Sequence, residues 1–371
     1  MDPLLENFKY VDSFNLGKNT TKMYINKYYQ ENFIHLTPNI QVKNIVDYIN
    51  EPINYVDKVL YDDAFYLSPN KHNINYFINQ QITTYANIDA VYNITEILSP
   101  HIFRQNNLLN FRYMVVDDQG GDFVRYVQYR KPNAYGVGIT KGHDWDYKYI
   151  NTTLFNPYDG YDLSGNVIVK ENWENLIEAA NGDIQERYNL VVCNRHIKED
   201  YNRRELELLY VQSLIIQCII GLSCSVDKFV VHCYDITSTV NAQILFILSL
   251  CFTSISIIKP FVDHINTSDR YVVCEGIKYD QYNDVKNYVK PYTELLKDAT
   301  NYFTSNTYIS SLFSNPLPDD FVTWLTDRNN EVLEYQLTSF DNYYFDTASV
   351  YLNIPDNITV EPINTVMEKK Q

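Results

Sequence analysis

The sequence is poor in basic residues: Lys and Arg number 30 against 46 Asp and Glu, so the formal net charge is −16. A chain this acidic has no overall field that draws it onto a phosphate backbone, and any nucleic-acid role would need a local basic groove. Glycine (11) and tryptophan (3) are also scarce, whereas tyrosine reaches 34. With Asn and Ile scattered throughout, this usage is typical of an AT-rich genome and favours a virus or parasite as source rather than any particular chemistry.

The sequence has no C-x-x-C pair, although it contains six cysteines. All of them lie in apolar runs, at Cys193, Cys218, Cys224, Cys233, Cys251 and Cys274. A metal or redox site is one interpretation, and reduced, buried thiols that pack as small hydrophobic side chains are the other. We predict the second and therefore no metal site.

A secretory signal is also lacking, because the first residues, MDPLLENFKYVD, carry an early acidic residue and no basic flank before an apolar stretch. We expect a reducing compartment, the cytoplasm of the cell or host, or a virion. Two apolar stretches, 206–226 and 240–258, have a length that raises the question of membrane spans. Polar residues such as Gln217 and Asn241 interrupt both, so we predict buried helices that cover a sheet and no membrane partner.

From about residue 111, short β-branched runs alternate with helical segments. The expected strands are 111–116, 135–139, 188–193, 228–233, 254–258 and 270–274, and the expected helices begin at Phe123 or cover 171–180, 203–222 and 239–251. Strands separated by helices of this length form βαβ units with right-handed crossovers. The predicted class is α/β, with one doubly wound, mostly parallel sheet of about seven strands in which 188–193 and 228–233 are central.

The flanking regions differ in composition. Residues 1–75 are polar and weakly periodic, which favours short helices, while 279–310 and 318–338 have helical patterns and an irregular acidic tail follows. We divide the chain into an N-terminal extension (1–78), a central domain (79–278) and a mostly helical C-terminal extension with its tail (279–371).

The turn VVDDQGGDFV, residues 115–124, joins the first strand of the domain to its first helix. Two glycines allow backbone N–H groups to approach a ligand closely, and a carboxylate there can accept from a hydroxyl or amino group. Without further signals, an ordinary glycine-containing turn explains the pattern as well as a ligand site does.

Several stretches together resemble the FtsJ-like RNA 2′-O-methyltransferases, specifically the cap-1 mRNA type of eukaryotes and large DNA viruses. They are YANIDAVY (85–92), GGDFVRYV after a strand, YGVGITKG (135–142) with FNPYDGYDLSGNV (155–167), and the ordered block of YNLVVCNRH, KFVVHCYD, IIKP and INTSDRYVVC. They cover about residues 80–278. The resemblance implies a Rossmann-like methyltransferase sheet, S-adenosylmethionine as cofactor and capped RNA as substrate.

The family has a catalytic tetrad of Lys, Asp, Lys and Glu. The resemblance places these four positions at Thr84, Asn194, His232 and Asp269, so every member is replaced. In the family, the central Lys acts as base and the carboxylates position it.

The resemblance also places cofactor-binding residues at Asp117, Gly120, Gly121 and Phe123. This loop is shorter than the family's, and Asp122 is inserted before Phe123. An added carboxylate beside a methionine carboxylate should weaken cofactor binding or abolish it.

Two functions follow as hypotheses. One is a degenerate methyltransferase fold, a pseudoenzyme that acts as a non-catalytic binding or structural subunit in a viral capping, transcription or virion assembly, with another protein as partner. The other is an active cap ribose 2′-O-methyltransferase that uses His232 as base. An unrelated α/β enzyme such as a nucleotide-dependent dehydrogenase lacks support, since no G-x-G-x-x-G is present.

Overall fold

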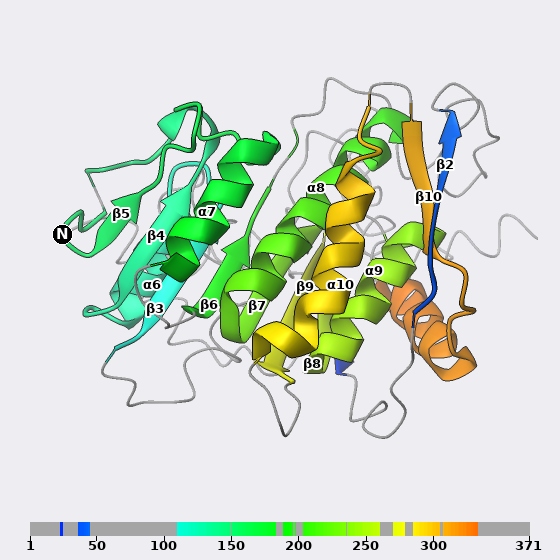
Figure 1. Cartoon of the computed structure of the whole chain (residues 1–371). Helices are drawn as coiled ribbons and strands as arrows, with labels where there is room; N and C mark the ends of the chain where they lie inside the picture. Colours follow the sequence, from blue (N-terminus) through cyan, green and yellow to red (C-terminus); the bar gives the residue numbers. More distant parts are fainter. Residues whose placement is uncertain are drawn as a thin grey trace, which may run out of the picture.

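The computed structural model describes residues 23–24, 36–44, 110–148, 150–182, 188–195, 197, 203–234, 236–259, 270–278, 285–304 and 307–332. Within these ranges a central sheet of eight strands is flanked by helices, and a small sheet of two strands lies at one side (Figure 1). The central strands are β1 (Met23–Tyr24), β3 (Arg112–Val116), β4 (Tyr135–Ile139), β5 (Phe155–Pro157), β6 (Tyr188–Cys193), β7 (Ser225–Cys233), β8 (Phe252–Ile258) and β9 (Arg270–Ile277). The small sheet pairs β2 (Pro38–Asn44) with β10 (Thr307–Phe313) in antiparallel register.

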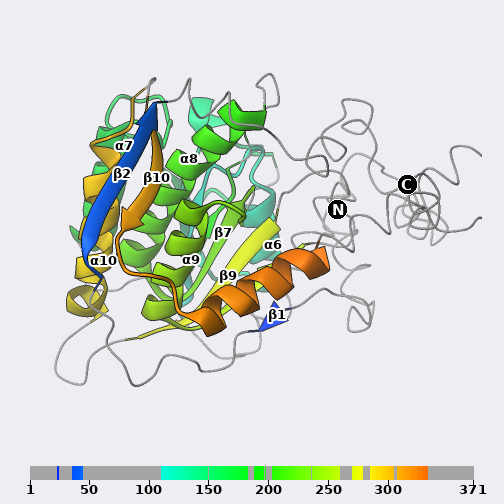
Figure 2. The ribbon, with the colours of Figure 1, turned by 90° about the vertical axis from the view of Figure 1, so that its right-hand side faces the viewer.

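The helices of the described part are α6 (Asp122–Arg130), α7 (Lys170–Gly182), α8 (Arg203–Cys224), α9 (Thr239–Cys251), α10 (Val285–Thr300) and a helix over residues 319–332; the 3₁₀ turn η2 covers Lys141–His143. Helices α8, α9 and α10 lie together on one face of the central sheet (Figure 1), and α6 lies on the opposite face (Figure 2).

The order of the central sheet is β1-β8-β9-β7-β6-β3-β4-β5. Strands β3 to β7 are parallel, whereas β9 runs antiparallel to both of its neighbours, β7 and β8. From β3 the chain proceeds to β4 and β5 on one side and to β6 and β7 on the other. The order therefore reverses between β3 and β6, which is the position where open α/β sheets bind ligands at the carboxyl ends of their strands.

The predicted doubly wound α/β class is confirmed, and β6 and β7 are interior strands. The strands are almost continuously buried because helices cover both faces of the sheet, so they read in the sequence as apolar runs rather than alternating ones.

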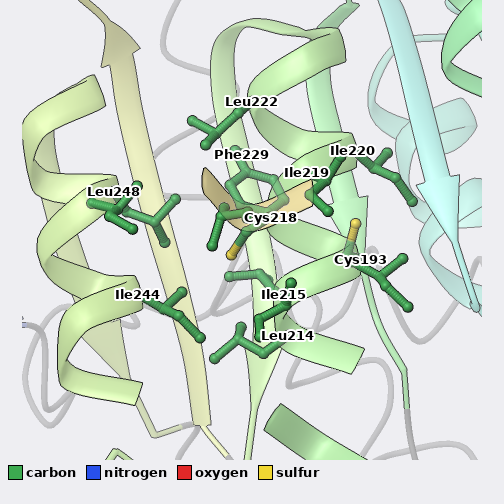
Figure 3. Close-up of a cluster of buried hydrophobic side chains, with 14 of the residues drawn as sticks. Cys193, Leu214, Ile215, Cys218, Ile219, Ile220, Leu222, Phe229, Ile244 and Leu248 are labelled. Atoms are coloured by element: carbon green, nitrogen blue, oxygen red, sulfur yellow. The ribbon is translucent and has the colours of Figure 1, made fainter. Parts of the chain in front are cut away.

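Side chains of α8, α9 and β7 meet in a cluster of the hydrophobic core (Figure 3). Ile215 and Ile219 of α8, Phe229 of β7 and Ile244 of α9 are all fully buried. Burial of one such side chain contributes roughly 1.5–3 kcal/mol. By length and composition the Glu207–Cys224 part of α8 would pass as a membrane span, but 83% of it is buried inside this fold, as expected for a core helix.

All six cysteines are buried and form no disulfide. Cys193 and Cys218 lie in the cluster of Figure 3 among leucine and isoleucine side chains. Burial raises the pKa of both thiols well above the ordinary value, so they stay protonated. These properties agree with the interpretation as core side chains.

The extensions differ from the prediction in two places. The N-terminal extension, expected to hold short helices, contributes the strand β2, and the end of the stretch expected to be helical, residues 307–310, belongs to the strand β10. The two strands are far apart in sequence: the hydroxyl of Ser310 on β10 donates to the carbonyl oxygen of Gln41 on β2, 269 residues earlier. The helical expectation holds for α10 and for residues 319–332. Other expectations for residues 1–75 and for the tail lie outside the described residues.

Candidate functional site

The candidate site lies where the order of the sheet reverses. Strand β3 ends at Val116, β6 at Cys193 and β7 at Cys233, and the antiparallel β9 begins at the same edge with Arg270, which pairs with Cys233. The loops that follow β3 and β6 therefore face each other across this edge.

The loop after β3 has an unusual backbone. Asp117, Gly120 and Gly121 have φ values of 56°, 80° and 79°. A Cβ atom at Gly121 would lie 2.6 Å from Cδ1 of Ile150, whereas one at Gly120 would meet nothing within 4 Å. Gly121 is thus required both by its left-handed conformation and by the close approach of Ile150.

Asp118 caps the helix that follows. Its Oδ2 accepts the backbone N–H groups of Phe123 (2.9 Å) and Val124 (3.3 Å), in the first turn of α6. The carboxyl group is buried, which raises its pKa well above the ordinary value, and the charge of Asp122 acts in the same direction. The two backbone N–H groups and a hydrogen bond with the Asn194 side chain act in the opposite direction.

Phe123, predicted to contact the cofactor, is 2% exposed. Its side chain belongs to the core, and its N–H group is used by Asp118. Phe123 therefore offers a ligand neither its side chain nor its backbone N–H.

Two of the four tetrad positions lie close together. The hydroxyl of Tyr271 on β9 donates to Oδ1 of Asn194 (3.0 Å), and the Tyr271 ring contacts the His232 ring edge-on, with centroids 5.1 Å apart. Asn194 and His232 thus lie against the same tyrosine at the ends of adjacent strands. Thr84 and Asp269 lie outside the described residues, so convergence of all four positions stays a prediction.

The imidazole of His232 is 1% exposed. Its Nδ1–H donates to the carbonyl oxygen of Arg195 (2.8 Å), and the ring of Tyr210 on α8 lies at a centroid distance of 5.9 Å. His232 is therefore enclosed by aromatic rings and fixed by a backbone acceptor.

Arg195 is a site residue that the sequence analysis did not single out. Its Nη1 donates to Oδ2 of Asp117 (3.0 Å), so an ion pair joins the loop after β6 to the loop after β3. The only signal in the sequence is a basic residue two positions after the end of a strand. Burial raises the pKa of Asp117, while Arg195 and the backbone N–H of Lys141 act to lower it.

The C-terminal extension reaches the same edge of the sheet. Nη1 of Arg270 donates to Oδ1 of Asn329 (2.8 Å), and Nδ2 of Asn329 donates to the carbonyl oxygen of Ile236 (3.0 Å). Asn329 belongs to the helix over 319–332, and this helix also packs through Phe321 edge-on against Phe246 of α9. The extension therefore holds the segment after β7 to the start of β9.

Two further observations concern possible ligands. Lys259, directly after β8, is fully buried, so its ammonium group is not at the surface for a ligand. Among the residues with described positions, no three His, Cys, Asp or Glu side chains gather in a way that could hold a metal ion.

Sequence comparison finds the same relationship as the motifs. The chain is 24% identical over 237 residues to an inactive cap-specific mRNA (nucleoside-2′-O-)-methyltransferase 1B of Caenorhabditis briggsae, covering 60% of this chain and 28% of that protein. It is 22% identical over 314 residues to cap-specific mRNA (nucleoside-2′-O-)-methyltransferase 1 of Mus musculus (80% and 36%), and 24% over 326 residues to the Xenopus laevis protein (78% and 38%). No family model matches the chain.

The solved structures found by comparison include a ribosomal RNA methyltransferase of Plasmodium falciparum, with a TM-score of 0.37 and 15% identity, covering 50% of this chain and 95% of that one. Human methyltransferase-like protein 13 in complex with SAH has a TM-score of 0.30 and 11% identity, covering 65% of this chain and 95% of that one.

The chain is thus similar to the cap-specific mRNA 2′-O-methyltransferases, as its motifs indicate, and it spans about a third of the length of these curated relatives.

Proposed function

We propose that this chain is a non-catalytic relative of the cap 2′-O-methyltransferases, a pseudoenzyme that serves as a binding or structural subunit of a larger assembly. The observation that carries the proposal is the state of His232. This residue holds the position of the family's central lysine, yet its ring is 1% exposed and its Nδ1–H is bound to the Arg195 carbonyl.

A general base must come within hydrogen-bond reach of the proton that it removes, here that of a ribose 2′-hydroxyl. An imidazole enclosed by Tyr210 and Tyr271 does not offer a ring nitrogen to a ribose at the surface. General-base help contributes about 10² to 10⁴ in rate, so its loss alone would make transfer very slow.

The neighbouring position supports the same conclusion. Asn194 has no negative charge, so it cannot favour a protonated partner as the family's aspartate does. Its side chain is used in hydrogen bonds to Tyr271 and Asp118 instead. One of the relatives above carries the word inactive in its name, which is a precedent for loss of activity among proteins of this kind.

A protein partner is supported by the loop between β5 and α7. Tyr161 and Leu163 are 71% and 70% exposed. Asn172, which is fully buried, fixes this loop: its Nδ2 donates to Oδ1 of Asp162 (2.8 Å), and its Oδ1 accepts the Asp162 N–H (3.1 Å). Because a preorganised apolar surface loses little conformational entropy on binding, it suits protein contact. We propose the cytoplasm as the compartment, where the six thiols stay reduced.

The alternative is an active cap ribose 2′-O-methyltransferase with His232 as base, and the shared contact of Asn194 and His232 with Tyr271 favours it. The two hypotheses make opposite predictions for one assay. The full chain is incubated with a short RNA that carries an unmethylated cap-proximal ribose and with radiolabelled S-adenosylmethionine.

We expect no methyl transfer from the wild type and no change in the variant His232→Ala. The variant with Thr84→Lys, Asn194→Asp, His232→Lys and Asp269→Glu together should also stay inactive, because the loop with Asp122 is altered as well. Transfer by the wild type that His232→Ala abolishes would contradict the proposal and identify His232 as the base.

The partner is tested by crosslinking in cells that express the protein. We expect one interface larger than about 1,000 Å², centred on the loop of Tyr161 and Leu163. The variant Tyr161→Ser/Leu163→Ser should lose the crosslinks, whereas Tyr302→Ser, another exposed aromatic position, should keep them.

A further inference from the structure

The reversal point of the sheet is where a methyltransferase-like fold would take its cofactor, and the question is whether the residues present leave room for it. Ligands in open α/β sheets bind outside the carboxyl ends of the strands at this point. Here the loops after β3 and β6 make direct contact with each other across it.

The first contact is the ion pair of Arg195 and Asp117. The guanidinium Nη1 lies 3.0 Å from the carboxylate Oδ2, and the two side chains are 20% and 8% exposed. The second contact joins the Asn194 side chain to the carboxyl of Asp118, which is 1% exposed. Asp117 and Asp118 of the loop after β3 therefore contact Arg195 and Asn194, respectively, of the loop after β6.

The backbone donors of the loop are also used within the protein. The N–H of Gly120 donates to the Asp144 carbonyl (2.8 Å) and that of Gly121 to the Asp118 carbonyl (3.1 Å). The N–H groups of Phe123 and Val124 donate to the Asp118 carboxyl group. A helix N-terminus binds an anionic ligand through such N–H groups, and here a side-chain carboxyl oxygen accepts them.

The backbone continues the sheet past the strand ends. The N–H of Asn194 donates to the Val116 carbonyl (2.9 Å), and the N–H of Asp117 donates to the Ile139 carbonyl (2.7 Å). These bonds draw the loops after β3, β4 and β6 together at their base.

We infer that the cofactor crevice of this fold is closed by its own side chains: Arg195, Asp117 and Asp118 take the place that the amino-acid end of S-adenosylmethionine would need. The residues present do not fit the cofactor. This inference rests on the proposed function and deepens it, because it names the groups that exclude the cofactor. Charge complementarity between Arg195 and Asp117 replaces that between the protein and a zwitterionic ligand.

The test measures the binding of S-adenosylhomocysteine to the full chain by isothermal titration calorimetry. The variant Arg195→Ala/Asp117→Asn removes both partners, so that no buried charge is left unpaired. We expect at least about tenfold tighter binding to this variant than to the wild type, a change of one order of magnitude in Kd. Arg195→Gln, which keeps a donor but loses the charge, should give a smaller gain.

The matched control is Arg328→Ala, which removes an ion pair of similar length to Glu331 (2.8 Å) on the C-terminal helix. It should leave binding unchanged. Cooperative thermal unfolding establishes that each variant is folded, and Arg195→Gln serves if the double variant is not.

Equal affinity of the wild type and a folded variant for S-adenosylhomocysteine would overturn the inference. If the wild type also transfers no methyl groups, that result leaves the proposed function standing. Methyl transfer by the wild type contradicts the proposed function itself.

Discussion

Asp118 is a carboxyl group almost without contact with water, and its ionisation should affect how stability depends on pH. Burial raises its pKa well above the ordinary value for an aspartate side chain. At a pH between the pKa of the unfolded chain and that of the folded state, the folded protein therefore holds a proton on Asp118 that the unfolded chain releases. The stability that this group contributes is fully present below pH about 4 and is lost as pH rises through the folded pKa.

We predict that Asp118→Asn removes this loss, since asparagine keeps an oxygen that can accept the N–H groups of Phe123 and Val124. The free energy of unfolding of the variant, relative to the wild type, should increase from pH 4 to pH 8, by about 1.4 kcal/mol for each unit of the removed shift. Urea unfolding at several pH values measures it.

Asp162→Asn is the control of opposite sign. Hydrogen bonds from Ser164 and Asn172 lower the pKa of Asp162, so its contribution is present above the unfolded pKa and is lost as pH falls. Parallel pH profiles for the wild type and Asp118→Asn would show that the Asp118 carboxyl does not titrate differently in the folded state.

At the same scale, the sequence predicted part of the site. Asn194 directly follows β6 and His232 lies at the end of β7, and both strands are apolar enough to be recognised, so the place of these residues at one edge of the sheet follows from topology. The role of Arg195 did not follow, because the direction of a long side chain depends on rotamers and partners that a strand pattern does not encode. Asp118 was recognised only as part of an acidic turn, since capping depends on the left-handed backbone of its neighbours.

Among the elements, the junction of α9 with β10 depends on one side chain. The register of β10 against β2 shifts between Ile309 and Ser311 and again between Ser311 and Phe313. Gln243 of α9 bonds the backbone there: its Oε1 accepts the Leu312 N–H (2.7 Å), and its Nε2 donates to the Phe313 carbonyl (2.9 Å). A β-bulge leaves backbone groups without ladder partners, and this buried amide replaces them.

We predict that Gln243→Leu destabilises the fold by about 1–3 kcal/mol, because the buried Leu312 N–H loses its acceptor, whereas the Phe313 carbonyl keeps the Ser311 hydroxyl as a donor (3.1 Å). Urea unfolding measures the loss. Gln128→Leu is the matched control: Gln128 forms the same two bonds, to the backbone of Asn151, but at an exposed position. Water replaces those bonds, so the control should cost less than about 1 kcal/mol, and equal losses would contradict the role given to burial.

The sequence predicted the elements of the central sheet well. Strands β4 and β6 and helix α9 have the bounds expected, because buried β-branched runs and an apolar helix have clear patterns. The small sheet was missed because nearly every residue of β2 is exposed, so no alternation marks it. The reversed direction of β9 was missed because strand direction is set by connections and not by the strand's own residues.

For the whole molecule, the distribution of cysteines gives a simple measure of how well the core excludes water. All six thiols are buried, from β6 across α8 to β9. We predict that Ellman's reagent finds close to no reactive thiol in the native protein and six after unfolding in guanidinium chloride. The reaction needs an exposed thiolate, and burial raises the pKa of Cys274 and Cys251 as well.

Where the reagent reacts faster than the core recloses, the rate of that reaction equals the rate of opening of the core. Fast reaction of one or more thiols under native conditions would show that part of the core opens without global unfolding.

The pairing of β2 with β10 also has a consequence for synthesis on the ribosome. Ser310 of β10, whose hydroxyl donates to the carbonyl oxygen of Gln41 in β2, lies 269 residues further along the chain. At about 5–20 residues per second, β2 is synthesised roughly 13–54 s before its partner. During that interval this strand carries unpaired backbone groups that invite contact with other nascent chains. Pro38 at its start and Lys43 near its end are residues that discourage such contact, so they protect the unpaired strand from aggregation until β10 is made.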